Sequence, residues 1–224
     1  MHLSIIIPTL NEASCIIDCL KPLQAIRAQG HEIVISDGDS NDSTIKLATP
    51  LVDQVVSSSR GRAKQMNAGA GVAKGDILLF LHADTILPKN STQLVINGLS
   101  TTHLCWGRFD VRLDGRHWML RIIEKSMNLR SRLTGIATGD QAIFVKRNIF
   151  MQAGRIPDIP LMEDIQLSKK LKVFSRPLCI HKKATTSSRR WEQRGILFTI
   201  LLMWRLRFAH FLGADISSLA RKYK

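Results

Sequence analysis

Acidic side chains follow the ends of apolar segments in this chain, where carboxylates can bind a cation or a polar ligand. The apolar run of residues 77–81 is followed at once by His82 and Asp84. A charged carboxylate at the end of a buried strand is costly unless a partner stabilises it. In open α/β sheets, ligands bind just beyond the carboxyl ends of the strands. We therefore expect a ligand or metal site at His82 and Asp84, the alternative being that Asp84 only caps a turn or the next helix.

Two earlier apolar segments end in the same way. The first is followed by a polar stretch that closes with Glu12, and the second by Asp37 and Asp39. Capping alone does not explain carboxylates at all three ends, whereas a bound nucleotide does. Asp37 can accept a hydrogen bond from a base, and Glu12 or Asp39 can bind a ribose. Asp84 can then hold a divalent metal that bridges a diphosphate.

Alternating strands and helices must bring these carboxylates together. In the first half the predicted strands are residues 3–7, 32–36, 53–57 and 77–81, and the predicted helices run from Asn11-Glu12 to Gly30, over a short stretch after Asp42, and over 61–73. Alternation with short connections indicates right-handed βαβ units, a parallel sheet and an α/β fold. The carboxyl ends of parallel strands share one edge, so the carboxylates are expected there.

The second half of the chain is less regular. We predict strands at 103–113 and 141–145, and helices at 116–133, at about 162–173 and at 195–212. The apolar side of the helix at 116–133 is expected to comprise Trp118, Met119, Ile122, Ile123 and Met127. The last helix opens with ten nearly all-apolar residues, which cover about 15 Å of a hydrocarbon core of about 30 Å. We therefore expect no membrane span. A buried core helix and a helix lying in the membrane interface both remain open, and the adjacent basic residues favour the second.

Positive charge is concentrated in the second half. Residues 1–100 contain 8 Lys and Arg against 9 Asp and Glu, whereas residues 101–224 contain 24 against 9. The second half is therefore expected to face something anionic: nucleic acid, a phospholipid surface or a phosphate-rich ligand. A length of 224 residues with 45% apolar residues fits one globular domain.

Cysteine spacing and the first residues bear on the compartment. Cys15, Cys19, Cys105 and Cys179 lack the spacing of a zinc site and are expected to be reduced thiols. The first residues lack the basic and long apolar segments of a signal peptide. We therefore expect a cytoplasmic location.

Several motifs, in this order, resemble those of a family 2 glycosyltransferase with the GT-A fold. They are residues 4–12, residues 37–42, the strand end His82-Ala83-Asp84, and residues 61–69, where the family has a nucleotide-contacting helix. The resemblance extends past residue 190 and is closest to the small bacterial transferases associated with radical-SAM/selenodomain proteins. It implies one GT-A domain over residues 1–224, with a nucleotide-sugar-binding half (1–100), an acceptor-binding half (101–192) and a C-terminal helical segment (193–224).

The resemblance implies a nucleoside-diphosphate sugar as donor and Mn²⁺ or Mg²⁺ as cofactor. The residues it places at the donor are Pro8, Thr9, Asn11, Glu12, Asp37, Asp39, Arg62 and Ala83. Asp84 matches the metal-binding Asp that ends the family's Asp-x-Asp motif. The first Asp of that motif is His82 here, and because histidine is a softer ligand it suits Mn²⁺ better than Mg²⁺.

The second half supplies the expected acceptor side. Gly139 and Asp140 precede a predicted strand, and Gly139 would let a sugar approach the backbone. Glu163 and Asp164 open a predicted helix, where either can compensate the helix dipole. Neighbours on a helix point about 100° apart, so only one is expected to face a shared pocket. By resemblance to the family's Glu-Asp motif, Asp164 is the catalytic base and Glu163 supports the acceptor.

A further stretch resembles the Gln-x-x-Arg-Trp motif of processive members of the family. Arg190 and Trp191 match the motif, but Ser187 replaces its Gln, so we do not infer processive polymerisation. Arginine can neutralise a leaving diphosphate, and tryptophan can stack on a sugar. The alternative for Arg189 is a solvated basic turn.

Together these motifs predict a metal-dependent, inverting glycosyltransferase that moves a sugar from a nucleoside-diphosphate sugar to a hydroxyl acceptor. The basic second half suits a lipid-linked acceptor at an anionic membrane surface, and so a peripheral location at the inner face of the membrane.

Other functional classes fit the residues less well. A sugar-phosphate nucleotidyltransferase would normally carry a Gly-rich loop with Arg or Lys at residues 9–12. A nucleic-acid-binding module would suit the basic half, but its stacking aromatic residues are sparse and the carboxylate edge would repel a polyanion, so no nucleic-acid partner is expected. A catalytically inactive scaffold is the third alternative.

Overall fold

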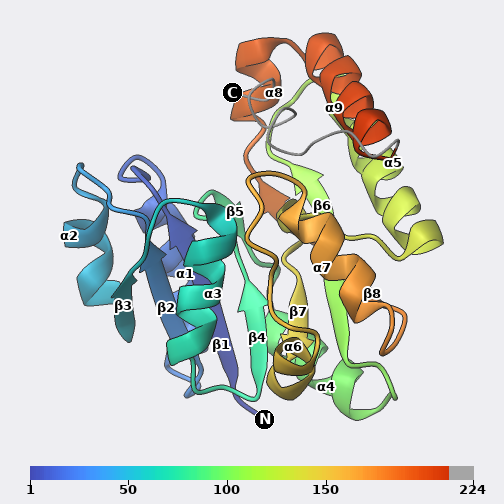
Figure 1. Cartoon of the computed structure of the whole chain (residues 1–224). Helices are drawn as coiled ribbons and strands as arrows, with labels where there is room; N and C mark the ends of the chain where they lie inside the picture. Colours follow the sequence, from blue (N-terminus) through green and yellow to red (C-terminus); the bar gives the residue numbers. More distant parts are fainter. Residues whose placement is uncertain (212–224) are drawn as a thin grey trace.

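The computed structural model describes residues 1–211, apart from the side chains of Arg190, Arg194, Arg207, Phe208, His210 and Phe211. Within that range one eight-stranded sheet runs through both halves of the chain, in the order β3-β2-β1-β4-β7-β6-β8-β5 (Figure 1). The predicted α/β fold is therefore confirmed. The nucleotide half and the acceptor half proposed from the sequence share this one sheet.

The first half builds the parallel part of the sheet. Its strands are β1 (Leu3–Thr9), β2 (Glu32–Asp37), β3 (Gln54–Ser57) and β4 (Ile77–Phe80). β1 pairs in parallel with β2 and β4, and β2 pairs in parallel with β3, as predicted. The connecting helices are α1 (Ile16–Arg27), α2 (Thr44–Ala48), which continues into the 3₁₀ turn η1 (Thr49–Leu51), and α3 (Arg62–Val72).

The first helix begins later than predicted. Residues 11–15 form a turn, and the backbone of Asn11 is left-handed, with φ of 57°. A non-glycine residue in that conformation cannot continue a right-handed helix. Asn11 instead ties the ends of β1 and β2 together: its backbone N–H donates to Ser40 Oγ at 2.9 Å, and its side-chain Oδ1 accepts from Asn41 N at 2.9 Å.

The second half adds strands of mixed direction. They are β5 (Thr85–Ile86), β6 (Trp106–Leu113), β7 (Phe144–Lys146) and β8 (Leu178–Thr186). β7 is antiparallel to both β4 and β6, β8 runs parallel to β6, and β5 is antiparallel to β8. β8 was not predicted. The strand predicted at 141–145 starts later because residues Gly139–Gln141 form a 3₁₀ turn, η2, and Ala142 has a φ of 46°.

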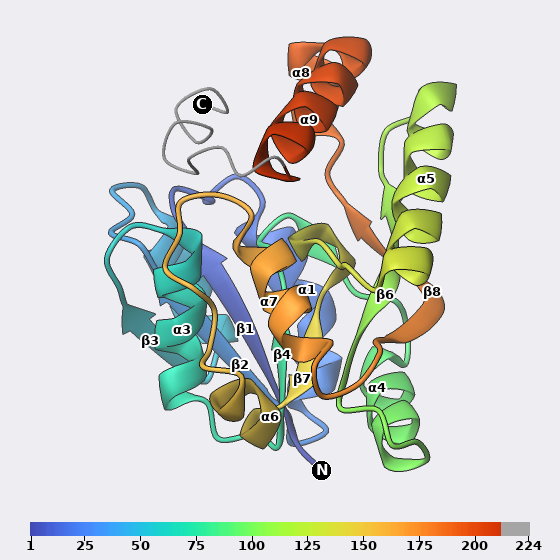
Figure 2. The ribbon, with the colours of Figure 1, turned by 45° about the vertical axis from the view of Figure 1, so that its right-hand side comes forward.

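The helices of the second half lie around and beyond the sheet. They are α4 (Ser91–Ser100), α5 (Trp118–Thr134), α6 (Arg147–Gln152), α7 (Glu163–Leu171), α8 (Arg189–Arg194) and α9 (Ile196–Phe211). α5, α7 and α9 confirm the predicted helices to within a few residues. α8 and α9 stand beyond the carboxyl ends of the parallel strands (Figures 1 and 2). Through residue 211, no helix combines the length and the apolar character that a bilayer span requires.

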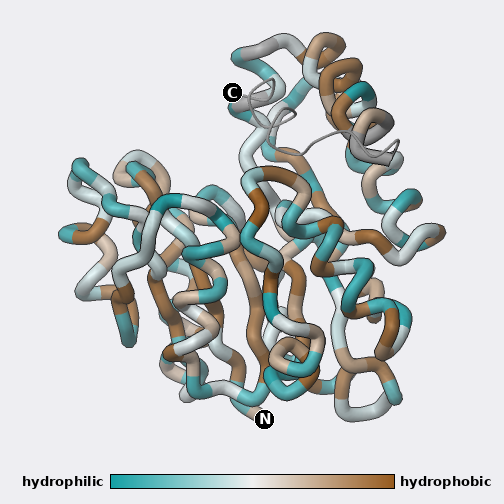
Figure 3. Tube along the Cα trace, in the orientation of Figure 1, coloured by the Kyte–Doolittle hydropathy of each residue, from teal (hydrophilic) through white to brown (hydrophobic). Residues whose placement is uncertain are grey.

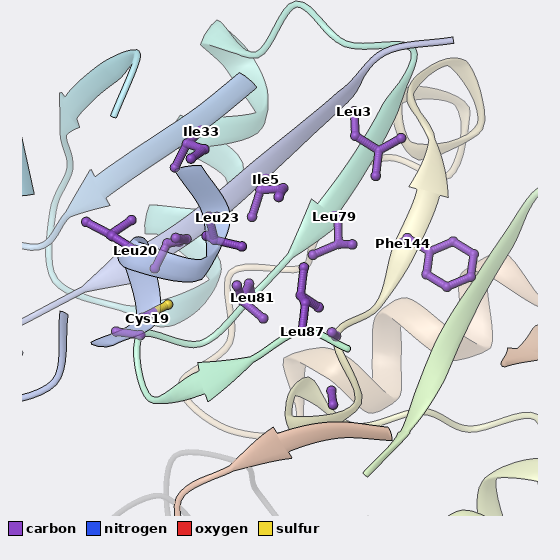
Figure 4. Packing of buried hydrophobic residues seen from close by; sticks show 14 of the residues in the cluster. Leu3, Ile5, Cys19, Leu20, Leu23, Ile33, Leu79, Leu81, Leu87 and Phe144 are labelled. Atoms are coloured by element: carbon purple, nitrogen blue, oxygen red, sulfur yellow. The ribbon is translucent and has the colours of Figure 1, made fainter. Parts of the chain in front are cut away.

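Alternate side chains of the central strands form two separate cores. On one face, Leu3, Ile5 and Leu79 pack with Leu20 and Leu23 of α1, as Figure 4 shows. On the other face, strand residues pack against α3, α6 and α7; this cluster includes Ile6, Val34, Leu78, Met66, Phe150 and Leu167. Because both faces are buried, β1 and β4 read as continuous apolar runs.

Candidate active site

A cavity of about 620 Å³ lies where the end of β4 meets η2, α7, α8 and α9. Its volume is in the range typical of small-molecule sites. Most of the predicted site residues line it: Glu12, Arg62, His82, Asp84, Gly139, Asp140, Glu163, Asp164 and Trp191. Residues from both halves of the chain therefore meet in one cavity.

The other predicted donor residues lie nearby but do not line the cavity. They are Pro8, Thr9, Asn11, Asp37, Asp39 and Ala83, at the ends of β1, β2 and β4. Ala83 is buried in the core. The side chain of Arg190 is outside the described part of the structure, although its backbone belongs to α8.

Asp37 holds the loop that follows β2. Its buried carboxylate accepts hydrogen bonds from Thr9 Oγ1 at 2.8 Å, from Ser40 N at 2.8 Å and from Ser40 Oγ at 2.6 Å. Asp39 is exposed, with a φ of 69°, and lies 3.7 Å from Arg60. A role for either residue at a nucleoside stays a prediction.

His82 contacts the acceptor half rather than standing alone at the strand end. Its Nδ1 lies 3.3 Å from Asp140 Oδ1. Its ring lies against Gly139, so closely that a Cβ at that position would overlap His82 Nε2. The missing side chain of Gly139 thus makes room for this imidazole, and the approach of a sugar to its backbone stays a prediction.

Asp84 has carboxylate capacity left for a ligand. Its Oδ1 accepts only long hydrogen bonds, from Thr85 Oγ1 at 3.4 Å and Thr186 Oγ1 at 3.5 Å. Among residues 1–211, no three His, Cys, Asp or Glu side chains gather into a metal site. One or two carboxylates do suffice where substrate phosphates complete the coordination of Mg²⁺. Asp84 fits such a shared site, and His82 lies beside it in the cavity wall.

Glu163 and Asp164 both line the cavity, so the expectation that only one would face it is wrong. The cavity reaches around the first turn of α7, where side chains that point apart still meet the same space. Asp164 Oδ2 accepts from Gly139 N at 3.0 Å, and its Oδ1 accepts from Ile165 N at 2.7 Å. These donors fix the carboxylate and link it to η2, which also carries the partner of His82.

Glu163 is buried beside a second carboxylate. Burial raises the pKa of Glu163, and the charge of Asp164 raises it further. Arg62 opposes this shift, with its Nη1 at 3.7 Å from Glu163 Oε1. Two neighbouring carboxyl groups disfavour the ionisation of both, and Arg62, which is half exposed, offsets this only in part. Glu163 therefore gives up its proton less readily than an exposed glutamate does.

Arg189, for which the sequence left a solvated turn as the alternative to a diphosphate contact, lines the cavity. Its Nη2 lies 4.0 Å from Glu12 Oε2, so it bridges α8 of the second half and the β1 end of the first. Ser188 anchors this turn, since its N–H and hydroxyl donate to Asp114 Oδ1 at 2.7 and 2.8 Å.

The cysteines match the expected reduced thiols. All four are free, and Cys15 Sγ donates to Glu12 Oε2 at 3.2 Å. Burial raises the pKa of Cys15 to about 12, and Glu12 adds to the shift. Burial also raises the pKa of Cys19 to about 12. Both stay protonated thiols at neutral pH, so neither is an activated nucleophile.

One family of proteins matches most of the chain. The model of "Glycosyl transferase family 2" matches residues 4–154. A "PGL/p-HBAD biosynthesis glycosyltransferase" of Mycobacterium bovis (strain BCG / Pasteur 1173P2) is 30% identical over 162 residues, which covers 67% of this chain and 61% of the relative. The relative of that name from Mycobacterium tuberculosis (strain ATCC 25177 / H37Ra) has the same identity and coverage. The chain thus spans about three fifths of the length of these curated relatives.

Solved structures share the fold. TarS 1-349 from S. aureus, in complex with UDP-GlcNAc, matches with a TM-score of 0.69 and 19% identity, over 84% of this chain and 58% of that one. The mannosyltransferase PcManGT from Pyrobaculum calidifontis, in complex with GDP-Man and Mn²⁺, matches with a TM-score of 0.67 and 21% identity, over 94% and 61%.

Proposed function

Because the chain belongs to glycosyl transferase family 2 and has the GT-A fold, we propose that it transfers a sugar from a nucleoside-diphosphate sugar to a hydroxyl acceptor. One observation carries the proposal. Asp84 of the first half and Asp164 of the second half line the same cavity, which is large enough for the reacting groups of both substrates. The related structures with UDP-GlcNAc and with GDP-Man and Mn²⁺ support the same class of donor and a divalent metal.

The first half would bind the donor. We place the nucleoside over the ends of β1 and β2, where Asp37 and Asp39 lie, and the diphosphate in the cavity near Asp84 and Arg62. His82 and Asp84 would hold the metal together with the diphosphate oxygens. A bound Mn²⁺ or Mg²⁺ supplies Lewis acidity that stabilises negative charge on the leaving phosphate.

Asp164 would act as general base. Its carboxylate takes the proton of the acceptor hydroxyl as that oxygen bonds to the anomeric carbon. The bond from this carbon to the diphosphate breaks in the same step, and its electron pair leaves with the nucleoside diphosphate. A single displacement of this kind inverts the configuration of the anomeric carbon.

Cationic and aromatic residues of the second half would complete the site. Arg189 lines the cavity and can neutralise a phosphate charge once it leaves Glu12. Arg190 stays a candidate for the same role from its sequence motif. Trp191 lines the cavity as well and offers a face on which an acceptor sugar can stack. An acceptor carried by a lipid at the inner face of the membrane fits the basic second half.

A thermal-shift panel tests the donor and the metal together. UDP-, GDP- and dTDP-sugars would be added with and without Mn²⁺ and Mg²⁺. A donor present at a hundred times its dissociation constant stabilises the native state by about 2.7 kcal/mol, which raises the melting temperature by several degrees. We expect one donor class to give this rise, and more with metal than without.

Two variants sharpen the panel. Asp84→Asn should lose the metal-dependent part of the shift, whereas Asp18→Asn, the same change at an exposed position of α1, should keep it. No shift with any donor would contradict the proposal. Release of diphosphate from a nucleoside triphosphate would favour a nucleotidyltransferase instead, and salt-sensitive nucleic-acid binding without donor binding would favour a nucleic-acid module.

A further inference from the structure

Helix α5 carries polar residues on its inner side. Glu124 is buried and its Oε1 accepts from Leu113 N at 2.6 Å. Asn128 is also buried: its Oδ1 accepts from Val111 N at 2.8 Å, and its Nδ2 donates to Val111 O at 3.0 Å. β7 pairs only with the first two residues of β6, so these side chains satisfy the backbone edge of β6 that β7 leaves open. The polar inner side of α5 thus has a structural reason.

The outer side of α5 is apolar. Trp118, Ile122, Leu129 and Leu133 are all exposed, Trp118 by 66% and Leu133 by 76%. Their spacings of four, seven and four residues place them along one stripe of the helix. A helix that only packed on β6 would carry polar residues there, so this stripe calls for a partner.

Helix α9 repeats the arrangement. Leu197, Phe198, Leu201 and Trp204 are each at least 60% exposed. The opposite side contributes Thr199, Met203 and Leu206 to the wall of the cavity. Figure 3 shows hydrophobic residues along much of α9, at the outside of the molecule. One helix therefore separates the cavity from an exposed apolar surface.

The two stripes belong to helices that pack together. Ile196 and Ile200 of α9 pack in one cluster with Leu120 and Ile123 of α5. We refer to the exposed residues as the α5–α9 face, which comprises Trp118, Ile122, Leu129, Leu133, Leu197, Phe198, Leu201 and Trp204. Large apolar residues gathered in this way mark an interaction site rather than ordinary surface.

Charge around the α5–α9 face indicates its partner. Arg116, Lys125 and Arg205 are exposed at or beside the two helices. The only acidic residue of α5 is the buried Glu124, and α9 has none. A second copy of the chain would bring like charges together, whereas apolar residues, tryptophans and flanking cations suit the interface of an anionic bilayer. We propose that the α5–α9 face docks on an anionic phospholipid membrane.

Docking on a membrane would also determine how the acceptor enters the cavity. This inference about the acceptor rests on the proposed glycosyl transfer. With the outer side of α9 in the headgroup region, its inner side lines the cavity that holds Asp164. An acceptor hydroxyl on a lipid headgroup or a lipid-linked sugar then reaches Asp164 by passing α9. The acceptor class is therefore membrane-bound rather than freely diffusing.

Vesicle flotation with the full chain tests the docking. The vesicles would contain about one part phosphatidylglycerol to two parts phosphatidylcholine, with pure phosphatidylcholine for comparison. We expect flotation with the anionic vesicles and less of it at high salt, because salt screens the cations. Ile122→Glu and Leu201→Glu should each weaken binding about tenfold or more, since each removes an apolar side chain that docking would bury in the bilayer interface.

Val173→Glu is the matched control. Val173 follows α7, is not one of the residues of the α5–α9 face and is 84% exposed, so the same change there should leave flotation intact. Equal flotation of all variants, or none by the unchanged chain, would overturn the proposal. So would a dimer in sedimentation that Leu201→Glu dissociates, since a second copy would then cover the face. Donor shifts in the same variants report on the proposed transfer separately.

Discussion

The two parts of the sheet meet their covering helices in different ways. In the parallel part, α1 and α3 bury apolar side chains against β1, β2 and β4. In the mixed part, α5 meets β6 through charged and amide groups in addition to the apolar contacts of Leu120 and Ile123 with Leu113. Arg108 is fully buried and paired with Asp110, which also binds Arg132 at 2.5 Å, and Asn128 and Glu124 bond to the backbone of β6.

This difference depends on whether the helices turn their large apolar residues inward or outward. We place a small polar ligand at one edge of the parallel part, whose helices can turn their large apolar residues inside. α5 and α9 instead present large apolar residues outward, and polar contacts add to the apolar ones that hold α5 to β6. Hydrogen bonds give less net stability than apolar burial, but a buried group left without its partner is costly. The second half should thus be sensitive to the loss of single polar groups.

The largest expected effect separates chemistry from donor binding. Asp164→Asn keeps the shape of the side chain but removes the base, so the turnover number should fall about a hundred- to ten-thousandfold. The donor-induced thermal shift should stay, because we place the donor on the first half. The turnover number is measured as release of nucleoside diphosphate from the donor that raises the melting temperature.

Asp158→Asn is the control for this change. Asp158 is exposed and pairs only at the surface, with Lys64 Nζ at 3.8 Å, so its loss should leave turnover unchanged. Turnover retained in Asp164→Asn would remove Asp164 as the base. Loss of donor binding in that variant would show instead that the two halves do not divide the work as we propose.

A smaller effect tests how α5 is held. Asn128→Leu leaves the N–H and the C=O of Val111 without their partner, and each buried unsatisfied group costs about 1–3 kcal/mol. We expect urea denaturation to show a loss of at least about 2 kcal/mol in the free energy of unfolding. Asn97→Leu, the same change at an exposed position of α4, should stay within about 0.5 kcal/mol of the unchanged chain. Equal losses would mean that α5 is not held by its polar side.

Much of the parallel part could be predicted from the sequence, because buried strands read as apolar runs and each ends in polar residues. The helix at α5 was found, but its inner side was predicted only in part, since Ile123 and Met127 do pack inside. Trp118 and Ile122 were assigned to the packed side, yet both are exposed, and Asn128 faces β6. An apolar stripe shows that a helix has a partner, and only the fold shows whether that partner lies inside the chain.

Parts of the site escaped prediction for similar reasons. β8 contains Lys182 and Lys183 in its middle, where both are exposed, so no apolar run marks it. The contacts of His82 with Gly139 and Asp140 join segments more than fifty residues apart, and local patterns carry no information on such pairs. The shared cavity position of Glu163 and Asp164 depends on how η2 closes around the start of α7.

The smallest expected effect concerns Glu163 and pH. Burial and the charge of Asp164 raise the pKa of Glu163 above its value of 4.5 in the unfolded chain. The native state therefore binds more protons than the unfolded state between the two pKa values, and stability falls as pH rises through that window. Glu163→Gln cannot ionise, so this part of the fall should disappear. Melting temperatures should be measured in a series of buffers of rising pH, starting at pH 4.5. The melting temperature of Glu163→Gln should exceed that of the unchanged chain by a growing amount as the pH rises.

The comparison needs a glutamate whose loss changes the charge of the chain equally. Glu192→Gln supplies it, since Glu192 is exposed on α8 and its removal changes the net charge by the same amount. If both variants diverge alike from the unchanged chain, overall charge is the cause. If only Glu163→Gln diverges, the cost arises from ionising a buried carboxyl beside Asp164, with Arg62 as its one cationic partner among the contacts described. A donor diphosphate that draws Arg62 away would raise this cost, so donor binding should widen the difference at neutral pH.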